Sequence, residues 1–133
     1  MRNRARATVL ALVLIMIAIG AVDALAAPAP GAHARRPSYD ASALELVGKG
    51  GYRAPQRAQL KLTVCLRKKI GKRSFDVRCE SAEARGKLIL AQVSVPGCVA
   101  GVWRTTASAE AIARDGTVLG SDSDVSRPFR CRS

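Results

Sequence analysis

Alternating apolar and polar residues recur along the second half of the chain. In residues 60–67 (LKLTVCLR) the apolar side chains fall on even positions, with Lys, Thr, Cys and Arg between them. A repeat of two places alternate side chains on opposite faces, so this pattern predicts a strand with one buried face. Residues 75–80 (FDVRCE) alternate in the same way, and the glycine-containing segment 70–74 between the two runs has the length of a hairpin connection.

A second hairpin is predicted downstream. Residues 102–112 (VWRTTASAEAI) place one set of side chains on a common face: Trp103, Thr105, Ala107, Ala109 and Ala111. The alanines make a helix the competing interpretation, but Val, Trp and two threonines at the start of the run suit a pleated sheet. Asp115-Gly116 then predicts a turn into a return strand over residues 117–120.

Three shorter runs complete the set of predicted strands. Residues 87–95 (KLILAQVSV) form one strand that stops at Pro96-Gly97, and residues 43–47 form a weaker first strand. Residues 125–131 form a last strand, which Pro128 makes an edge or irregular one. Six or seven short antiparallel strands separated by turn signals predict an all-β fold, a small antiparallel β-sandwich or barrel, and we expect the sandwich.

The start of the chain has the order of a secretory signal peptide. A positive segment with three arginines precedes an apolar run over residues 9–22, and Ala24-Leu25-Ala26 offers small residues at Ala24 and Ala26 for cleavage. The apolar run is shorter than the ~20 residues of a permanent transmembrane helix. We therefore expect residues 1–26 to be removed on export, with an uncleaved anchor as the alternative, and the protein to be secreted, either free or associated with the cell envelope.

Two further regions follow the predicted signal peptide. Residues 27–38 (APAPGAHARRPS) are rich in Ala and Pro, have no apolar period and are interpreted as a linker. Residues 39–133 are predicted to form the β-sandwich domain.

Four cysteines in this predicted domain indicate two disulfides, as in other short exported chains. Folding each hairpin about its turn brings Cys65 opposite Cys79 and Cys98 close to Cys131. The alternation places Cys65 on the polar face of its strand and Cys79 on the same face as Phe75. Residues directly opposite each other share one face of a sheet, so a Cys65–Cys79 pair requires a β-bulge that adds one residue. Without a bulge, Cys65 would pair with Cys98 or Cys131. No metal is expected, because no C-x-x-C pair occurs and the only histidine is His33, in the predicted linker.

Charge adds a candidate binding surface. Residues 1–26 hold three of the 22 Lys and Arg and one of the ten Asp and Glu, so the remaining chain has a net charge of +10. Such a balance favours anionic partners. The densest cluster is the predicted anion-binding set at the first hairpin: Arg67, Lys68, Lys69, Lys72 and Arg73. Sequence-specific nucleic acid binding is disfavoured by export and by the lack of stacking aromatics, because Phe75 alone is near and is expected in the core.

Few residues suit catalysis, and neither an enzyme nor a cofactor is expected. The predicted domain has no histidine, and disulfide formation would leave no thiolate. Glu80 and Glu83 are interpreted as solvated surface rather than as a glycosidase pair. Ser121–Asp124 is interpreted as a polar turn, since Ca²⁺ takes six to eight oxygen ligands. The glycines of residues 48–51 precede no predicted helix, which argues against a phosphate cradle.

The two segments 60–79 and 102–120 together resemble the small Ig-like or fibronectin type III-like β-sandwich domains of secreted bacterial proteins. The antibody pattern of an inter-sheet cysteine pair with a tryptophan between is missing. The resemblance implies a binding or spacer module. We therefore expect a non-catalytic binding or adhesion module for an anionic envelope polymer or a protein partner. The alternative is a secreted effector, either a protein inhibitor or a cationic antimicrobial, although no exposed hydrophobic loop is identifiable for it.

Overall fold

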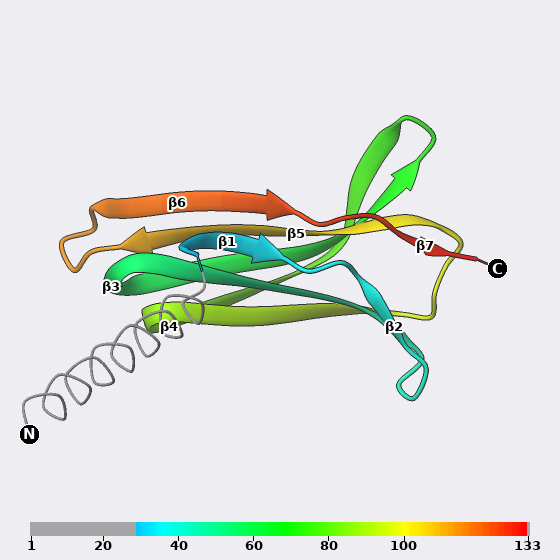
Figure 1. The fold of residues 1–133 in the computed structure, drawn as a ribbon, viewed down its shortest axis with the longest axis horizontal. Coiled ribbons are helices and arrows are strands. Elements are labelled where there is room, and N and C mark those ends of the chain that lie inside the picture. The colour runs from blue at the N-terminus through cyan, green and yellow to red at the C-terminus, as the bar shows by residue number, and fades with distance from the viewer. Residues whose placement is uncertain (1–28, 133) are drawn as a thin grey trace, which may run out of the picture.

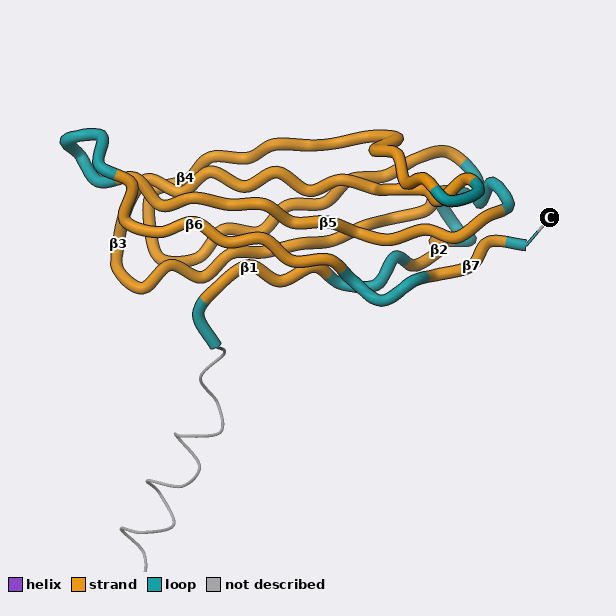
Figure 2. Tube along the Cα trace, turned by 90° about the horizontal axis from the view of Figure 1, so that it is seen from above, coloured by secondary structure: helices purple, strands orange, loops and turns teal. Residues whose placement is uncertain are grey.

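The computed structural model describes residues 29–132, and these residues form strands and turns. The predicted signal peptide and its cleavage residues lie outside the described residues. The strands are β1 (Gly31–Ala34), β2 (Ser38–Asp40), β3 (Glu45–Ile70), β4 (Arg73–Pro96), β5 (Gly101–Ile112), β6 (Val118–Val125) and β7 (Phe129–Cys131). All the strand pairings are antiparallel and join one curled sheet (Figures 1 and 2). The prediction of an all-β antiparallel fold of six or seven strands is confirmed, and the number is seven. None of the described residues forms a helix that is able to span a bilayer.

Two unusually long strands, β3 and β4, organise the sheet. They pair from Leu46↔Val95 to Ile70↔Arg73, with a register shift after Arg53, where residues 54–57 interrupt the ladder. The interruption lets both strands bend, so each contributes to both halves of the sheet. The four predicted strands at 43–47, 60–67, 75–80 and 87–95 are therefore parts of only two.

The two halves of β3 have different partners, and this curls the sheet. Its first half pairs with β1 and β2, and its second half pairs with β5, which in turn pairs with β6 and β7. Side-chain carboxylates close the curl between β1 and β6. The N–H of Ala32 donates to Asp122 at 2.7 Å, and the N–H of Ala34 donates to Asp124 at 2.8 Å. The segment interpreted as a polar turn therefore lies in β6, and its two carboxylates bind the β1 backbone.

The core lies between the two halves, on the inward face of the strands. Its largest fully buried side chains include Trp103, Leu46, Leu60, Leu62 and Leu66. Glycines on β3 allow the halves to approach closely: a Cβ at Gly48 would lie 2.9 Å from the Leu66 side chain, and one at Gly50 would lie 2.9 Å from Val64. This close approach explains how a domain with few aromatic residues fills its interior.

The predicted face of β5 is confirmed, and the helix alternative is wrong. Trp103, Thr105, Ala107, Ala109 and Ala111 are all buried, and the residues between them are half-buried or exposed. The Asp115-Gly116 turn also lies where the sequence predicts it, between β5 and β6. Pro128 separates β6 from the three-residue β7, so the predicted last strand is shorter than expected.

The boundary of the folded region lies earlier than predicted. Gly31–Ala34 pairs with residues 50–53 of β3, and Ser38 begins β2, so these parts of the predicted linker belong to the sheet. The sequence GAHA has no apolar alternation from which a strand could be predicted. Instead, backbone hydrogen bonds to β3 and the two carboxylates of β6 hold β1 in the sheet.

Removing the β6 carboxylates should release β1. We expect Asp124→Ala to lower the free energy of unfolding by about 1–2 kcal/mol, because the Ala34 N–H loses a charge-assisted acceptor in a partly buried position. Hydrogen exchange at Ala32 and Ala34 should accelerate more than exchange in β5. Ser123→Ala is the matched control on the same strand, since Ser123 is exposed. Equal protection of β1 in both variants would contradict this role of Asp124.

Candidate binding surface

Both predicted disulfides are present, Cys65–Cys79 and Cys98–Cys131. Cys65 lies directly opposite Cys79, and the register shifts just beyond them: Leu66 pairs with Arg78 and Arg67 with Asp76, which leaves Val77 as the extra residue. This is the β-bulge that the phase of the two cysteines required. The alternative pairings of Cys65 with Cys98 or Cys131 are therefore wrong.

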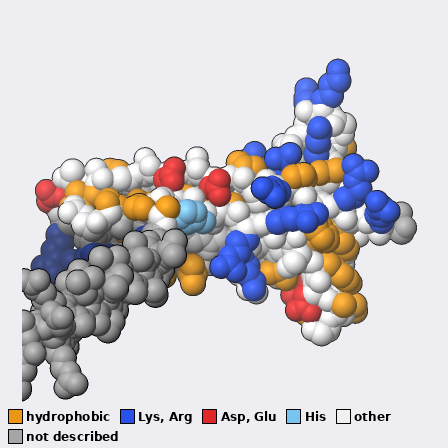
Figure 3. Space-filling model, in the orientation of Figure 1, with side chains coloured by type: hydrophobic (Ala, Val, Ile, Leu, Met, Phe, Trp, Pro, Cys, Tyr) orange, Lys and Arg blue, Asp and Glu red, His pale blue; other side chains and the backbone are white. Residues whose placement is uncertain are grey.

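Beyond this disulfide the hairpin continues as an arm, which we define as residues 67–78. It contains the end of β3, a two-residue turn at Gly71-Lys72 and the start of β4. Gly71 has φ +64°, which suits glycine at the first central position of a type II′ hairpin turn. Residues 67–69 at the base of the arm still pair with β5, and the rest of the hairpin projects from the body of the sheet (Figure 1). Lys and Arg side chains gather on the arm and on the adjoining surface (Figure 3).

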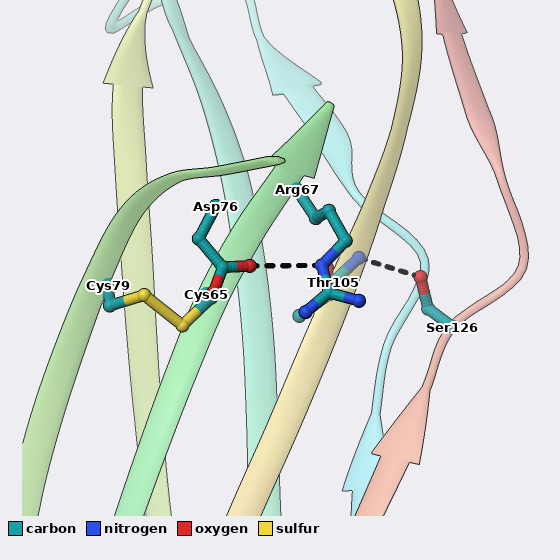
Figure 4. Close-up of polar contacts among 6 residues, drawn as sticks. All are labelled: Cys65, Arg67, Asp76, Cys79, Thr105 and Ser126. Atoms are coloured by element: carbon teal, nitrogen blue, oxygen red, sulfur yellow. Dashed lines mark hydrogen bonds and ion pairs between the residues drawn. A yellow bond between two sulfur atoms is a disulfide. The ribbon is translucent and has the colours of Figure 1, made fainter. Parts of the chain in front are cut away.

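The predicted anion-binding residues all lie on this arm but differ in their contacts. The Arg67 guanidinium Nε lies 3.0 Å from the Asp76 carboxylate (Figure 4), so part of its charge is neutralised. The Lys68 ammonium lies 5.8 Å from the centroid of the Trp103 ring, within cation–π range. Lys69, Lys72 and Arg73 are exposed and form no ion pair with any residue in 29–132.

The sheet register brings further arginines beside the arm, which were not predicted from the sequence. Arg104 on β5 lies directly opposite Arg67, while Val102 lies between Lys69 and Arg130 of β7. Residues directly opposite each other share a face of the sheet, so these cations extend the charge from the arm across β5 and β7. We define the cationic surface as the cations of this face together with two cations at the tip of the arm: Arg67, Lys69, Arg104 and Arg130, with Lys72 and Arg73. The only sequence signal for its C-terminal part is the arginine-rich end RPFRCR, at residues 127–132.

Two contacts hold the chain before β7 in place, and so position Arg130. The N–H of Thr105 donates to the Ser126 hydroxyl at 2.9 Å (Figure 4), and that hydroxyl donates to the Arg127 carbonyl at 2.9 Å. The Cys98–Cys131 disulfide fixes the other side of Arg130. The C-terminal cations therefore lie on a tethered strand.

The residue types that could serve in catalysis, metal binding or phosphate binding have structural roles here. The carboxylates of Glu80 and Glu83 lie 3.7 Å from Arg78 and 3.9 Å from Lys61, as exposed surface ion pairs. Cys65, Cys79 and Asp76 form a group close enough to hold a metal ion, but the two sulfur atoms are bonded to each other, so neither is a thiolate ligand. The glycines of residues 48–51 lie within β3.

The shifted pKa values also have structural causes. The Ser42 hydroxyl, and then the N–H groups of Ala43 and Ser42, hold the pKa of Asp40 below its ordinary value. The Thr117 N–H does the same for the pKa of Asp115 in the β5–β6 turn. Burial, with a smaller effect of Asp122, raises the pKa of Tyr52 above 10.0. None of these groups belongs to the cationic surface.

An open groove of about 740 Å³ lies on the half of the sheet that contains β1. Exposed Leu88 and Leu90 form an apolar side, and Arg35 and Lys49 supply positive charge. The wall includes Ala29, the first described residue. The arm, in contrast, is formed entirely by described residues.

No protein-family model matches this chain, and a comparison with curated proteins gives no significant match. The geometry and charge of the cationic surface are therefore the features that indicate a function. The two disulfides indicate an oxidising compartment.

Proposed function

We propose that the protein is an exported, non-catalytic binding module that attaches to an anionic polymer of the cell envelope, or to an anionic protein partner, through the cationic surface. The observation that carries the proposal is the register of β3, β5 and β7, which brings Arg104 and Arg130 beside the charged arm. Asp76, paired with Arg67, is the one acid within the arm.

Electrostatics explains why such a surface would select a polyanion. Like charges in neighbouring positions of a sheet repel one another, and an extended anion that lies across several of them relieves this repulsion. The attraction is screened by salt, because the Debye length is about 8 Å at physiological ionic strength. Binding is therefore expected to weaken steeply as salt increases.

Two features of the sequence support export and a binding role. The predicted signal peptide and the disulfides agree with folding outside the cytosol. The Ig-like or fibronectin type III-like resemblance also agrees with a binding module. Sequence-specific recognition of nucleic acid stays disfavoured by an exported location.

A secreted effector, either a protein inhibitor or a cationic antimicrobial, is the second candidate. The sequence offered no exposed hydrophobic loop for it, but Ile70, Phe75 and Val77 are exposed on the arm. Leakage of dye from bacterial-lipid vesicles would favour an antimicrobial, whereas attachment without leakage would favour a binding module.

The proposal is tested by neutralising the tip of the arm. A variant with Lys68→Gln, Lys69→Gln, Lys72→Gln and Arg73→Gln should elute from immobilised heparin at clearly lower salt than the wild type. The matched control removes four exposed cations elsewhere: Arg35→Gln, Arg57→Gln, Arg85→Gln and Arg114→Gln.

The two variants have the same net charge, so they separate a local surface from overall charge. We expect the control to elute close to the wild type. Equal shifts of both variants, or unchanged elution of the arm variant, would overturn the proposal. The same comparison on an anionic cell-wall preparation extends it to an envelope polymer.

A further inference from the structure

The two faces of the arm differ in chemistry. Phe75 lies opposite Lys68 and Arg73 lies opposite Ile70, and these four side chains share the face that points inward in the body of the sheet. The other face carries Lys69, Ser74, the Arg67–Asp76 ion pair and the disulfide. One face of the arm therefore mixes apolar and cationic side chains, and the other face is polar and charged.

On the arm, the other half of the sheet no longer covers the inward face. Leu66 and Trp103 are 0% and 2% exposed and form the last buried layer of the core. Beyond them, Ile70 is 60% exposed, Phe75 48% and Val77 51%. The prediction that Phe75 lies in the core is wrong, because the facing half of the sheet ends before the arm does. Ile70 and Phe75 are diagonal neighbours on one face of the hairpin, and Val77 is the extra residue of the bulge. Exposed apolar residues that cluster in this way are a candidate interaction site.

Cations surround these apolar side chains. Lys68, Lys72, Arg73 and Arg78 lie within a few residues of them along the two paired strands. Long Lys and Arg side chains can extend their charge into a polar layer while their stems cover apolar surface. A purely polar anion such as a wall polymer would satisfy the cations but offers no apolar phase for Ile70, Phe75 and Val77. An anionic lipid bilayer offers both within the headgroup and acyl boundary.

We infer that the arm docks on a bilayer that contains anionic phospholipid, with Ile70, Phe75 and Val77 at the acyl boundary and the surrounding cations among the phosphates. This inference goes beyond the proposed function, because it adds an anionic bilayer to the polymer and protein partners proposed above. The Cys65–Cys79 disulfide at the base of the arm and its two-residue turn hold the hairpin in shape before binding. Little conformational entropy is then lost on docking.

The test uses the oxidised, full-length mature chain and vesicles of phosphatidylglycerol with phosphatidylcholine. The wild type should bind these vesicles and not vesicles of phosphatidylcholine alone. The variant Ile70→Ser, Phe75→Ser and Val77→Ser keeps every charge, and its affinity for the anionic vesicles should fall at least tenfold. Its retention on heparin should stay at the wild-type level.

A matched control replaces three exposed apolar residues outside the arm: Leu88→Ser, Leu90→Ser and Val118→Ser. This control should bind vesicles as the wild type does. As a second measurement, Phe75→Trp should show a blue shift of its added fluorescence when anionic vesicles are present, against the constant signal of buried Trp103.

The outcomes separate the two claims. Wild-type vesicle affinity in the arm serine variant, or absence of vesicle binding together with heparin retention that depends on the four tip cations, overturns membrane docking and leaves the proposed function intact. Loss of both vesicle binding and tip-dependent heparin retention overturns both. An equal loss in the arm and control variants would show that apolar surface anywhere is sufficient, and would also overturn docking by the arm.

Discussion

Trp103→Ala is expected to lower the free energy of unfolding by about 3–5 kcal/mol, as for other large-to-small changes of buried aromatic residues. Trp103 is among the largest fully buried side chains and closes the core beneath the arm. Its indole N–H donates to the Val99 carbonyl at 2.9 Å, and Lys68 covers its ring. Removing the side chain leaves a cavity, an unpaired acceptor and a loosened base for the arm.

Urea unfolding of the oxidised protein, followed by circular dichroism, measures this loss. Trp103→Phe is the matched variant, because it keeps most of the apolar volume and removes the N–H donor. We expect it to lose clearly less stability than the alanine variant. A loss below about 1 kcal/mol for Trp103→Ala would mean that the end of the core repacks around the gap.

Removing the Cys98–Cys131 disulfide is expected to be almost as damaging. In the loop-entropy model, its sequence separation of 33 residues corresponds to about 4 kcal/mol, against about 3 kcal/mol for the 14 residues between Cys65 and Cys79. The difference in stability loss between the two disulfides should be larger than the loop-entropy model gives. Cys65 and Cys79 join β3 and β4, which already pair with each other before and after the disulfide, whereas Cys131 tethers a strand of three residues.

Two double variants test this difference, Cys98→Ala with Cys131→Ala and Cys65→Ala with Cys79→Ala. Their unfolding midpoints are compared under non-reducing conditions. The first should also weaken heparin retention, because Arg130 loses the tether that holds it beside the arm. A greater loss of stability from the second variant would show that the arm depends on its disulfide more than the C-terminal strand does.

The sequence predicted those parts of the fold that depend on local alternation. The buried face of β5 and the strand at residues 60–67 are examples, because a repeat of two records burial directly. The strand β1 was missed, because its short GAHA sequence is held by hydrogen bonds to β3, Asp122 and Asp124. The fusion of four predicted strands into two depended on a bend at residues 54–57, which has no distinct apolar pattern.

The candidate site was only half predictable for the same reason. The tip cations are neighbours in sequence, so their clustering is visible without a structure. Arg104 and Arg130 join them through strand pairing across tens of residues, which no local pattern encodes. The exposure of Phe75 depends on where the facing half of the sheet ends, and alternation alone cannot locate that edge.

The sharing of β3 and β4 between both halves of the sheet limits how this chain can be divided. Each half takes part of its backbone from the same two strands, so a cut at the bend would remove pairing from both halves at once. We therefore expect that no proteolytic fragment keeps one half intact and that the two halves unfold together. The bend is therefore a corner within a single cooperative unit, not a boundary between two subdomains.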